Sequence, residues 1–266
     1  MALLFLLLLS FSLTAQEIYF QMEDSAGDEG VEYPTAPFFS PGQGYFDLLS
    51  FQVSGDGKRL AFDFEFARVA NPWQAPEGFS HQLIDLYLDT APGGKTETRL
   101  EGAGVSFDPE HGWEHQLRLM PWGGSALYGS RDSSPVEVSL LPDGKTIRAQ
   151  VAQELLGSPR PDWGYYLLVG SYDGFGPDNY RQIQRRAGPW NFGGERAGAV
   201  IDFLAPDSQG RLSQEALLQP PSVLFPMGVK FNSRPKILVW LTVCFLALFT
   251  ALELYRLRLR SAQKKT

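Results

Sequence analysis

Hydrophobic and polar side chains alternate along two neighbouring segments of the chain. Large apolar residues occupy every second position from Leu60 to Phe66, and the same period recurs from Ile84 to Asp89. A period of two is typical of a β-strand with one buried face. Roughly ten strands separated by turns rich in Gly, Pro and Asp predict an antiparallel β-sandwich. The other strand-like segments include 47–53, 113–120, 136–140, 147–151, 163–172 and 199–204.

An aromatic loop, residues 71–79, joins the two alternating segments. Its two prolines and its glycine exclude regular structure, and it presents Trp73 beside Asn71. One interpretation is that this loop contacts a ligand. The other is that Trp73 and Phe79 fold back and cap the end of the sandwich core, because buried aromatic residues supply much of any core.

Two more loops, residues 121–124 and 189–194, also carry a tryptophan between Pro and Gly residues. A flat aromatic ring stacks on the C–H face of a sugar, while side-chain amides hydrogen-bond to its hydroxyl groups. The candidate carbohydrate-binding residues are therefore Trp73, Asn71, Trp122, Trp190 and Asn191.

The segment from Glu17 to Glu32 carries six acidic residues and no basic one. Within it, residues 24–30 place carboxylates around two glycines, and calcium prefers clustered oxygen ligands on a tightly turning backbone. The spacing is not that of an EF-hand loop, so a solvated acidic arm is the alternative.

Both ends of the chain carry apolar segments. Residues 1–15 contain no charge and resemble a secretory signal peptide; because no Lys or Arg precedes the apolar run, an uncleaved N-terminal anchor stays open. A helix over 237–255 is about 28 Å long, close to the hydrocarbon thickness of a bilayer. The basic tail, 256–266, places that end in the cytoplasm, and the Pro-containing segment 218–236 predicts an extended stalk.

Charge divides the chain in the same way. Residues 16–229 hold 15 basic and 29 acidic side chains, net −14, whereas residues 230–266 hold 8 basic and 1 acidic, net +7, which sum to −7. Such an acidic ectodomain repels nucleic acid and anionic lipid. The single cysteine, Cys244, lies in the predicted membrane helix. The sequence therefore predicts no disulfide, thiolate zinc site or cysteine nucleophile in the ectodomain.

Catalytic chemistry is the function class that the sequence supports least. Asp63 with Glu65, or Asp85 with Asp89, could form the carboxylate pair of a glycoside hydrolase, but acids spaced in this way are ordinarily on the solvent face of a strand. The sequence shows no Ser-His-Asp order, phosphate loop or metal-ligand spacing. We therefore expect no enzymatic activity.

Several segments together resemble the C-terminal domain of bacterial glucodextranases, over about Asp24 to Leu217. That domain belongs with the DOMON-like sandwiches related to family 9 carbohydrate-binding modules. The resemblance implies a jelly-roll-like sandwich that binds glycans and has no catalytic machinery. The segments are DSAGDEG (24–30), YPT (33–35), FDL (46–48), NPW (71–73), GFS (78–80), IDLYLD (84–89), DGFG (173–176) and WNFGG (190–194).

The resemblance also implies a calcium ion, which here would be held by Asp24, Asp28, Glu29 and Asp47. Two positions depart from the family's pattern, since Ser25 stands where a proline is expected and Glu29 where a second aspartate is expected. Calcium is the cofactor that we expect, with a role in stabilising the domain.

The sequence thus predicts an all-β protein, an antiparallel jelly-roll-like β-sandwich with one C-terminal transmembrane helix. Its extracytoplasmic domain, residues 16–217, is expected to bind an α-glucan-like polysaccharide or oligosaccharide. A structural domain that docks onto a partner envelope protein through a sheet edge or a tryptophan face is one alternative. A haem-binding electron-transfer domain is the other, because some DOMON-like domains bind haem through His and Met. Its candidate ligands are His81, His111, His115, Met22, Met120 and Met227.

Overall fold

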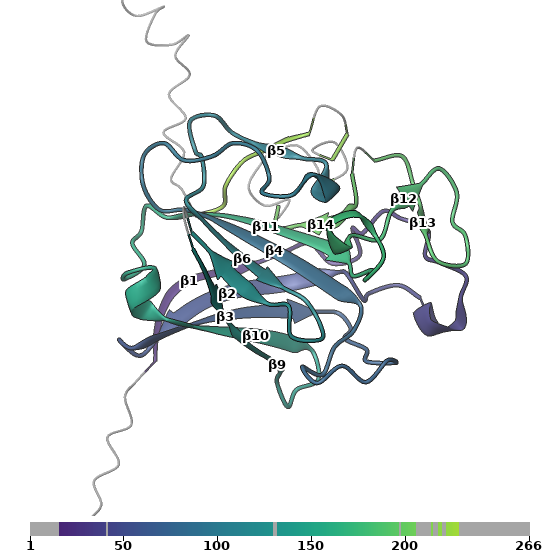
Figure 1. Cartoon of the computed structure of the whole chain (residues 1–266), viewed down its shortest axis with the longest axis horizontal. Coiled ribbons are helices and arrows are strands. Elements are labelled where there is room, and N and C mark those ends of the chain that lie inside the picture. The colour runs from purple at the N-terminus through teal and green to yellow at the C-terminus, as the bar shows by residue number, and fades with distance from the viewer. Residues whose placement is uncertain are drawn as a thin grey trace, which may run out of the picture. The chain divides into compact units, whose positions relative to one another are not determined.

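Two antiparallel sheets pack face to face in the computed structural model of the chain (Figure 1). The structure describes residues 16–40, 42–129, 132–196, 198–205, 214, 218–219 and 222–228. The strand order of the first sheet is β1-β2-β3-β10-β9, formed by Glu17–Glu23, Leu48–Gly55, Arg59–Phe66, Thr146–Ala152 and Glu137–Leu140. The order of the second is β14-β11-β4-β6-β7-β8, formed by Val200–Phe203, Gly164–Ser171, Gln82–Asp89, His115–Leu119, Ala126–Tyr128 and Ser133–Pro135.

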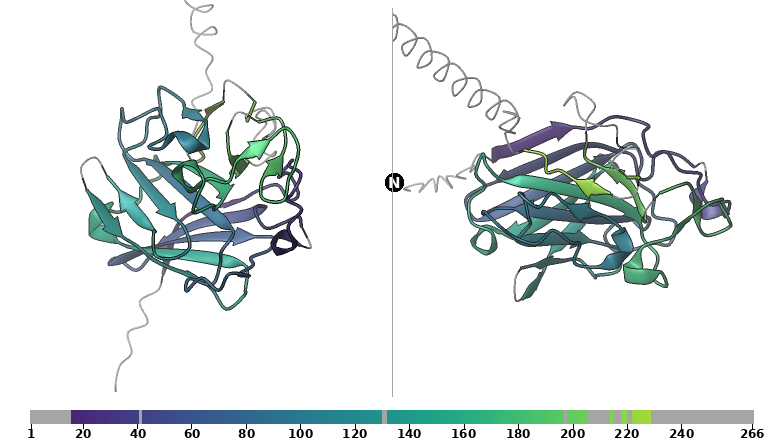
Figure 2. Two further views of the ribbon diagram at one scale, coloured as in Figure 1. Left: turned by 45° about the vertical axis from the view of Figure 1, so that its right-hand side comes forward. Right: turned by 90° about the horizontal axis from the view of Figure 1, so that it is seen from above.

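Smaller elements lie in the connections between these strands. Two short parallel pairs join β12 (Ile183–Gln184) to β13 (Phe192–Gly193) and β5 (Ser106–Phe107) to β15 (Val223–Leu224). The described residues also contain single 3-10 turns, η1 to η4, at Pro37–Phe39, Glu101–Ala103, Gln153–Leu155 and Pro177–Asn179. The loops around β12 and β13 lie at one end of the sandwich together with η1 (Figure 2).

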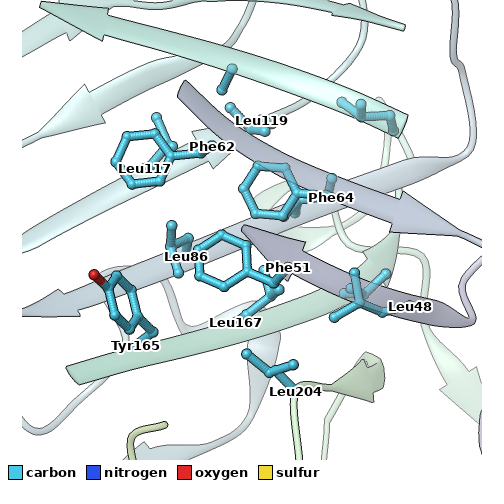
Figure 3. Packing of buried hydrophobic residues seen from close by; sticks show 14 of the residues in the cluster. Leu48, Phe51, Phe62, Phe64, Leu86, Leu117, Leu119, Tyr165, Leu167 and Leu204 are labelled. Carbon is cyan, nitrogen blue, oxygen red and sulfur yellow. The ribbon is translucent and has the colours of Figure 1, made fainter. Parts of the chain in front are cut away.

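The main core lies between the two sheets and follows the alternation in the sequence. The four large apolar side chains of β3, from Leu60 to Phe66, are fully buried, whereas Asp63 and Glu65 between them are half-buried. Asp63 instead pairs with Arg148 on β10 at 2.6 Å. The predicted strands are thereby confirmed, and the predicted segments 136–140 and 147–151 form β9 and β10, which pair with each other. Figure 3 shows this packing around Leu48, Phe51, Phe62, Phe64, Leu86, Leu117, Leu119, Tyr165, Leu167 and Leu204.

A second core covers the outer face of the second sheet. All eight residues of β4 are buried, because loops pack over the side that faces away from the first sheet. Here the expectation that Asp85 and Asp89 face solvent is wrong, since they are 1% and 8% exposed. Asp85 forms an ion pair with Arg118 at 3.4 Å. The apolar members of this core include Leu83, Tyr87, Phe107, Trp113, Tyr166, Tyr180, Phe203, Leu218 and Leu224.

Three features of the chain differ from the expectations or add to them. The acidic N-terminal arm begins with an edge strand, β1, which pairs with β2. The strands β3 and β4 belong to different sheets, so the aromatic loop between them crosses from one sheet to the other. Part of the expected stalk packs on the sandwich, because Leu218, Leu224 and Met227 are buried and Met227 pairs with Tyr165.

The terminal segments that carry the predicted signal peptide, membrane helix and basic tail lie outside the described residues. Within the described residues, no helix has the length and apolar character needed to cross a bilayer. The predictions for residues 1–15, 237–255 and 256–266 therefore stay predictions.

Truncation of a core ring should separate structural from exposed aromatic residues. Phe64→Ala removes a fully buried ring, and we expect it to destabilise the domain by about 3–5 kcal/mol. The measurement is urea unfolding of the full chain followed by near-UV circular dichroism. Phe175→Ala is the matched control, because Phe175 is fully exposed and should change the free energy of unfolding by less than about 0.5 kcal/mol. Equal losses in the two variants would contradict this packing.

Candidate functional site

The three loop tryptophans meet at one cleft. Its volume is about 650 Å³, and each tryptophan comes from a different connection, after β3, β6 and β12. The loop that follows β11 supplies the remaining wall. The residues that line the cleft are Trp73, Trp122, Tyr172, Asp173, Gly174, Phe175, Arg181 and Trp190.

The tryptophan rings rest on other aromatic residues. Trp190 stacks on Phe38 with ring centroids 5.8 Å apart, and Trp122 packs on Tyr172 at 5.5 Å. About half of each tryptophan is nevertheless exposed, 50% for Trp190 and 45% for Trp122. The cleft therefore offers exposed aromatic surface, and the packing against Phe38 and Tyr172 limits the movement of the two rings.

The first tryptophan loop contributes both to the core and to the wall of the cleft. Phe79 is fully buried in the main core, so it caps the sandwich as the alternative interpretation expects. Trp73 is half-buried; its ring lies edge-on to His81 at 4.9 Å, yet it also lines the cleft.

The charged groups of the cleft neutralise each other. Arg181 forms an ion pair with Asp173 at 3.2 Å, and its other N–H groups donate to the carbonyl oxygens of Trp190 and Tyr172 and to the hydroxyl of Ser171. Burial lowers the pKa of Arg181, an effect that Asp173 opposes. The guanidinium thus braces three segments of the cleft wall.

Neither of the two predicted asparagines lines the cleft. Asn71 exchanges hydrogen bonds with the backbone of Ala75, at 2.7 and 2.8 Å, and so closes its own turn. The amide of Asn191 donates to the carbonyl oxygens of Arg186 and Phe192. Both side chains shape the loops that present the tryptophans.

The DGFG segment (173–176) also contributes to the cleft, although none of its residues is among the predicted carbohydrate-binding residues. Asp173, Gly174 and Phe175 from this segment line the cleft, together with Tyr172 and Arg181 beside it. The signal that could have found them is the exposed Phe175 between two glycines, a costly arrangement in a loop unless the ring has a partner.

A cluster of carboxylates forms a second candidate site. One oxygen from each of Asp28, Asp47 and Asp202 lies within 4.8 Å of the others. Burial, together with repulsion from Asp28 and Asp47, raises the pKa of Asp24 to about 7. Burial, and then repulsion from Asp24 and Asp28, also raises the pKa of Asp202.

The donor set fits a hard cation such as calcium. Oxygen Oδ2 of Asp24 is buried and has no hydrogen-bond partner among the described residues, which is the arrangement of an available ligand. A divalent ion among these carboxylates would remove the repulsion that raises their pKa values. Asp202 was not predicted, because it is a single polar residue within an otherwise apolar strand, β14.

Glu29, the fourth predicted ligand, has hydrogen-bond partners outside this cluster. Its carboxylate accepts hydrogen bonds from the backbone N–H groups of Gly44 and Phe46, at 3.0 and 2.9 Å, and from the hydroxyl of Tyr33. The side chain therefore holds the turn before β2. Asp24, Asp28 and Asp47 remain as predicted ligands, and Asp202 joins them.

Two of the histidines named for the haem alternative have partners within the chain. Nitrogen Nε2 of His81 lies 3.0 Å from the carbonyl oxygen of Phe38, and Nδ1 of His111 lies 3.0 Å from the carboxylate of Asp89. Met227 is buried in the main core. These partners favour structural roles for the three residues.

Residues 18–223 match the family model described as the C-terminal binding-module, SLH-like, of glucodextranase. The chain belongs to this family. The glucodextranase resemblance of the sequence is thereby confirmed. The chain is also similar to a family 9 carbohydrate-binding module from Caldicellulosiruptor kristjanssonii in complex with cellotriose, with 14% identity, 57% of this chain and 73% of that chain covered, and a TM-score of 0.28. No curated protein matches the chain.

The pH dependence of stability should report the buried histidine of this binding module. Burial lowers the pKa of His81 from 6.5 to about 4, so the unfolded chain binds a proton that the folded chain excludes between these values. The stabilisation is complete above pH 6.5 and is lost as the pH falls towards 4. We expect acidification from pH 7 to pH 5 to remove about 2 kcal/mol through this residue.

The measurement compares denaturant unfolding of the wild type and His81→Gln at the two pH values. The carboxylates with raised pKa values respond in the opposite direction, but they are common to both proteins and cancel in the difference. If the two proteins lose the same free energy on acidification, His81 is not the group responsible.

Proposed function

We propose that the aromatic cleft binds carbohydrate. The observation that carries this proposal is the convergence of Trp73, Trp122 and Trp190 on one cleft from three separate loops. Indole rings offer flat apolar faces to the C–H face of a pyranose, and the cleft volume of about 650 Å³ lies within the range of small-molecule sites. The ligand that we favour is an α-glucan or a related oligosaccharide, since the family is named for a glucodextranase.

The polar groups of the cleft suit a neutral ligand. Arg181 and Asp173 are already paired, so neither presents an uncompensated charge to a sugar. Asp173 also accepts a hydrogen bond from the backbone of Phe175 at 3.0 Å. Hydroxyl groups of a sugar could share these acceptors without breaking the ion pair.

We further propose that calcium stabilises the domain without taking part in catalysis. Asp24, Asp28, Asp47 and Asp202 are the residues that would hold the ion, which would supply charge compensation. The binding-module family supports a non-catalytic protein. On the basis of the sequence alone, we also propose that a helix over residues 237–255 anchors the protein in a membrane, with the domain outside the cytoplasm.

Removal of a cleft tryptophan should abolish retention by carbohydrate while the fold persists. Trp190→Ala deletes a half-exposed ring, and we expect at least a tenfold loss of affinity, as for a tryptophan at the centre of a binding site. The measurement is electrophoretic retardation of the purified full chain in gels that contain α- or β-glucans. Unfolding curves of the same variant report its stability.

Leu155→Ala is the matched control for this experiment. Leu155 is also an exposed apolar residue. It lies in the same 3-10 turn as Gln153, whose backbone N–H group donates to the carbonyl oxygen of Lys58 in the turn before β3. The aromatic loop begins at the other end of β3. The control should migrate like the wild type. Absence of retardation of the wild type by every glucan would contradict carbohydrate binding.

Calcium should raise the melting temperature of the full chain, and a neighbouring pair of variants should locate the ion. Asp28→Asn removes a carboxylate of the cluster and should abolish the shift, which for the wild type is worth about 2.7 kcal/mol at a hundred times Kd. Glu29→Gln should lower the melting temperature but keep the shift, because Glu29 bonds to Gly44, Phe46 and Tyr33 instead. Identical melting of the wild type with calcium and with chelator would contradict the proposal.

A further inference from the structure

The turn that carries Trp122 has an unusual backbone. Trp122 has a φ of 60° and Gly123 a φ of 80°, so two successive residues between β6 and β7 are left-handed. Such turns favour Asn and Gly, because a side chain at positive φ is strained. A large aromatic residue held in this conformation points to a functional constraint on its ring.

One carboxylate holds this turn in place. Glu77 accepts hydrogen bonds from the backbone N–H groups of Trp122 and Gly123, at 3.0 and 2.7 Å. Consecutive N–H groups that converge in a turn form a concavity that binds an anion, and here a side chain of the same protein fills it. These charge-assisted hydrogen bonds offset the strain at Trp122.

Glu77 is itself fixed from the opposite side. Its carbonyl oxygen accepts a hydrogen bond from the N–H group of Leu140 on β9, at 2.8 Å. The next residue, Gly78, has a φ of 93°, and a Cβ atom there would lie 2.8 Å from the Cβ atom of Leu140. The backbone around Glu77 therefore lies directly against the first sheet.

The carboxylate of Glu77 consequently connects two loops that both supply a tryptophan to the cleft. Its own loop carries Trp73, and the turn it binds carries Trp122. The first loop is attached to β9 in one sheet, and the second joins β6 and β7 in the other. Glu77 is not among the residues that line the cleft.

We propose that Glu77 is a positioning residue for carbohydrate binding, which sets the placement of Trp122 relative to Trp73 before the ligand arrives. This inference rests on the proposed function of the cleft. A binding site whose side chains are already in place loses less conformational freedom when the ligand binds. Glu77 should therefore contribute to the affinity only through Trp122, the ring that it positions.

The test uses Glu77→Gln and Glu77→Ala in the full chain, alone and combined with Trp122→Ala. Glutamine keeps one acceptor oxygen, whereas alanine removes both. We expect the affinity for the glucan that retards the wild type to fall about tenfold in Glu77→Ala and less in Glu77→Gln. In the Trp122→Ala background the same substitutions should have no further effect.

A ligand-free readout separates this inference from the proposed function. The near-UV circular dichroism and fluorescence of the wild type and Glu77→Ala should differ, and the difference should vanish in the Trp122→Ala background. Asp56→Asn is the matched control, because Asp56 also accepts two backbone N–H groups, in the turn between β2 and β3. It should change neither the spectrum nor the affinity.

Two results would overturn the inference. Wild-type spectra in both Glu77 variants would show that the carboxylate does not hold Trp122. Equal losses of affinity with and without Trp122 would show that Glu77 acts by another route. If the wild type binds no glucan, the proposed function fails and the role in carbohydrate binding fails with it, while the spectra still decide whether Glu77 positions the ring.

Discussion

The buried ion pair between Asp85 and Arg118 is the interaction on which the arrangement of the loops depends. Two charges removed from water are tolerated only when their remaining hydrogen-bonding groups are satisfied. Tyr180 donates to Asp85 at 2.6 Å, and Arg118 donates to the carbonyl oxygen of Asp178. Asp178 has a φ of 54°, so the pair secures a strained turn that follows directly on the DGFG segment of the cleft. The polar side of β4 thus connects the sheet to the site.

The carboxylate cluster also connects segments that are distant in the sequence. Asp24 and Asp28 follow β1, Asp47 precedes β2, and Asp202 lies on β14. The backbone of Leu48 donates to Asp202 at 2.7 Å, which links the first sheet to the edge of the second. Repulsion among the ionised carboxylates opposes that link. The charge on the cluster therefore affects how strongly the two sheets are held together at this edge.

Local periodicity was sufficient to predict the strands, because burial of one face of a strand leaves a direct pattern in the sequence. It could not show that β3 and β4 lie in different sheets, or that Asp85 lies beneath a layer of loops. The tryptophans were predictable as exposed loop aromatics, whereas Arg181 and Asp202 were not. The role of Asp202 depends on a partner far away in the chain, and that of Arg181 on the way in which the loops on both sides of it fold back around its side chain. Neither arrangement leaves a recognisable spacing in the sequence.

The short parallel pair of β5 and β15 constrains when the domain can complete its folding during synthesis. Its hydrogen bonds run from the N–H groups of Ser106 and Asp108 to the carbonyl oxygens of Ser222 and Leu224. Leu224 and Met227 fill the two cores from the same segment. Contacts across so long a stretch of chain form late, after most loop-closure entropy has been lost. During synthesis the sandwich therefore stays incomplete, with apolar surface of both cores uncovered, until residue 227 has left the ribosome.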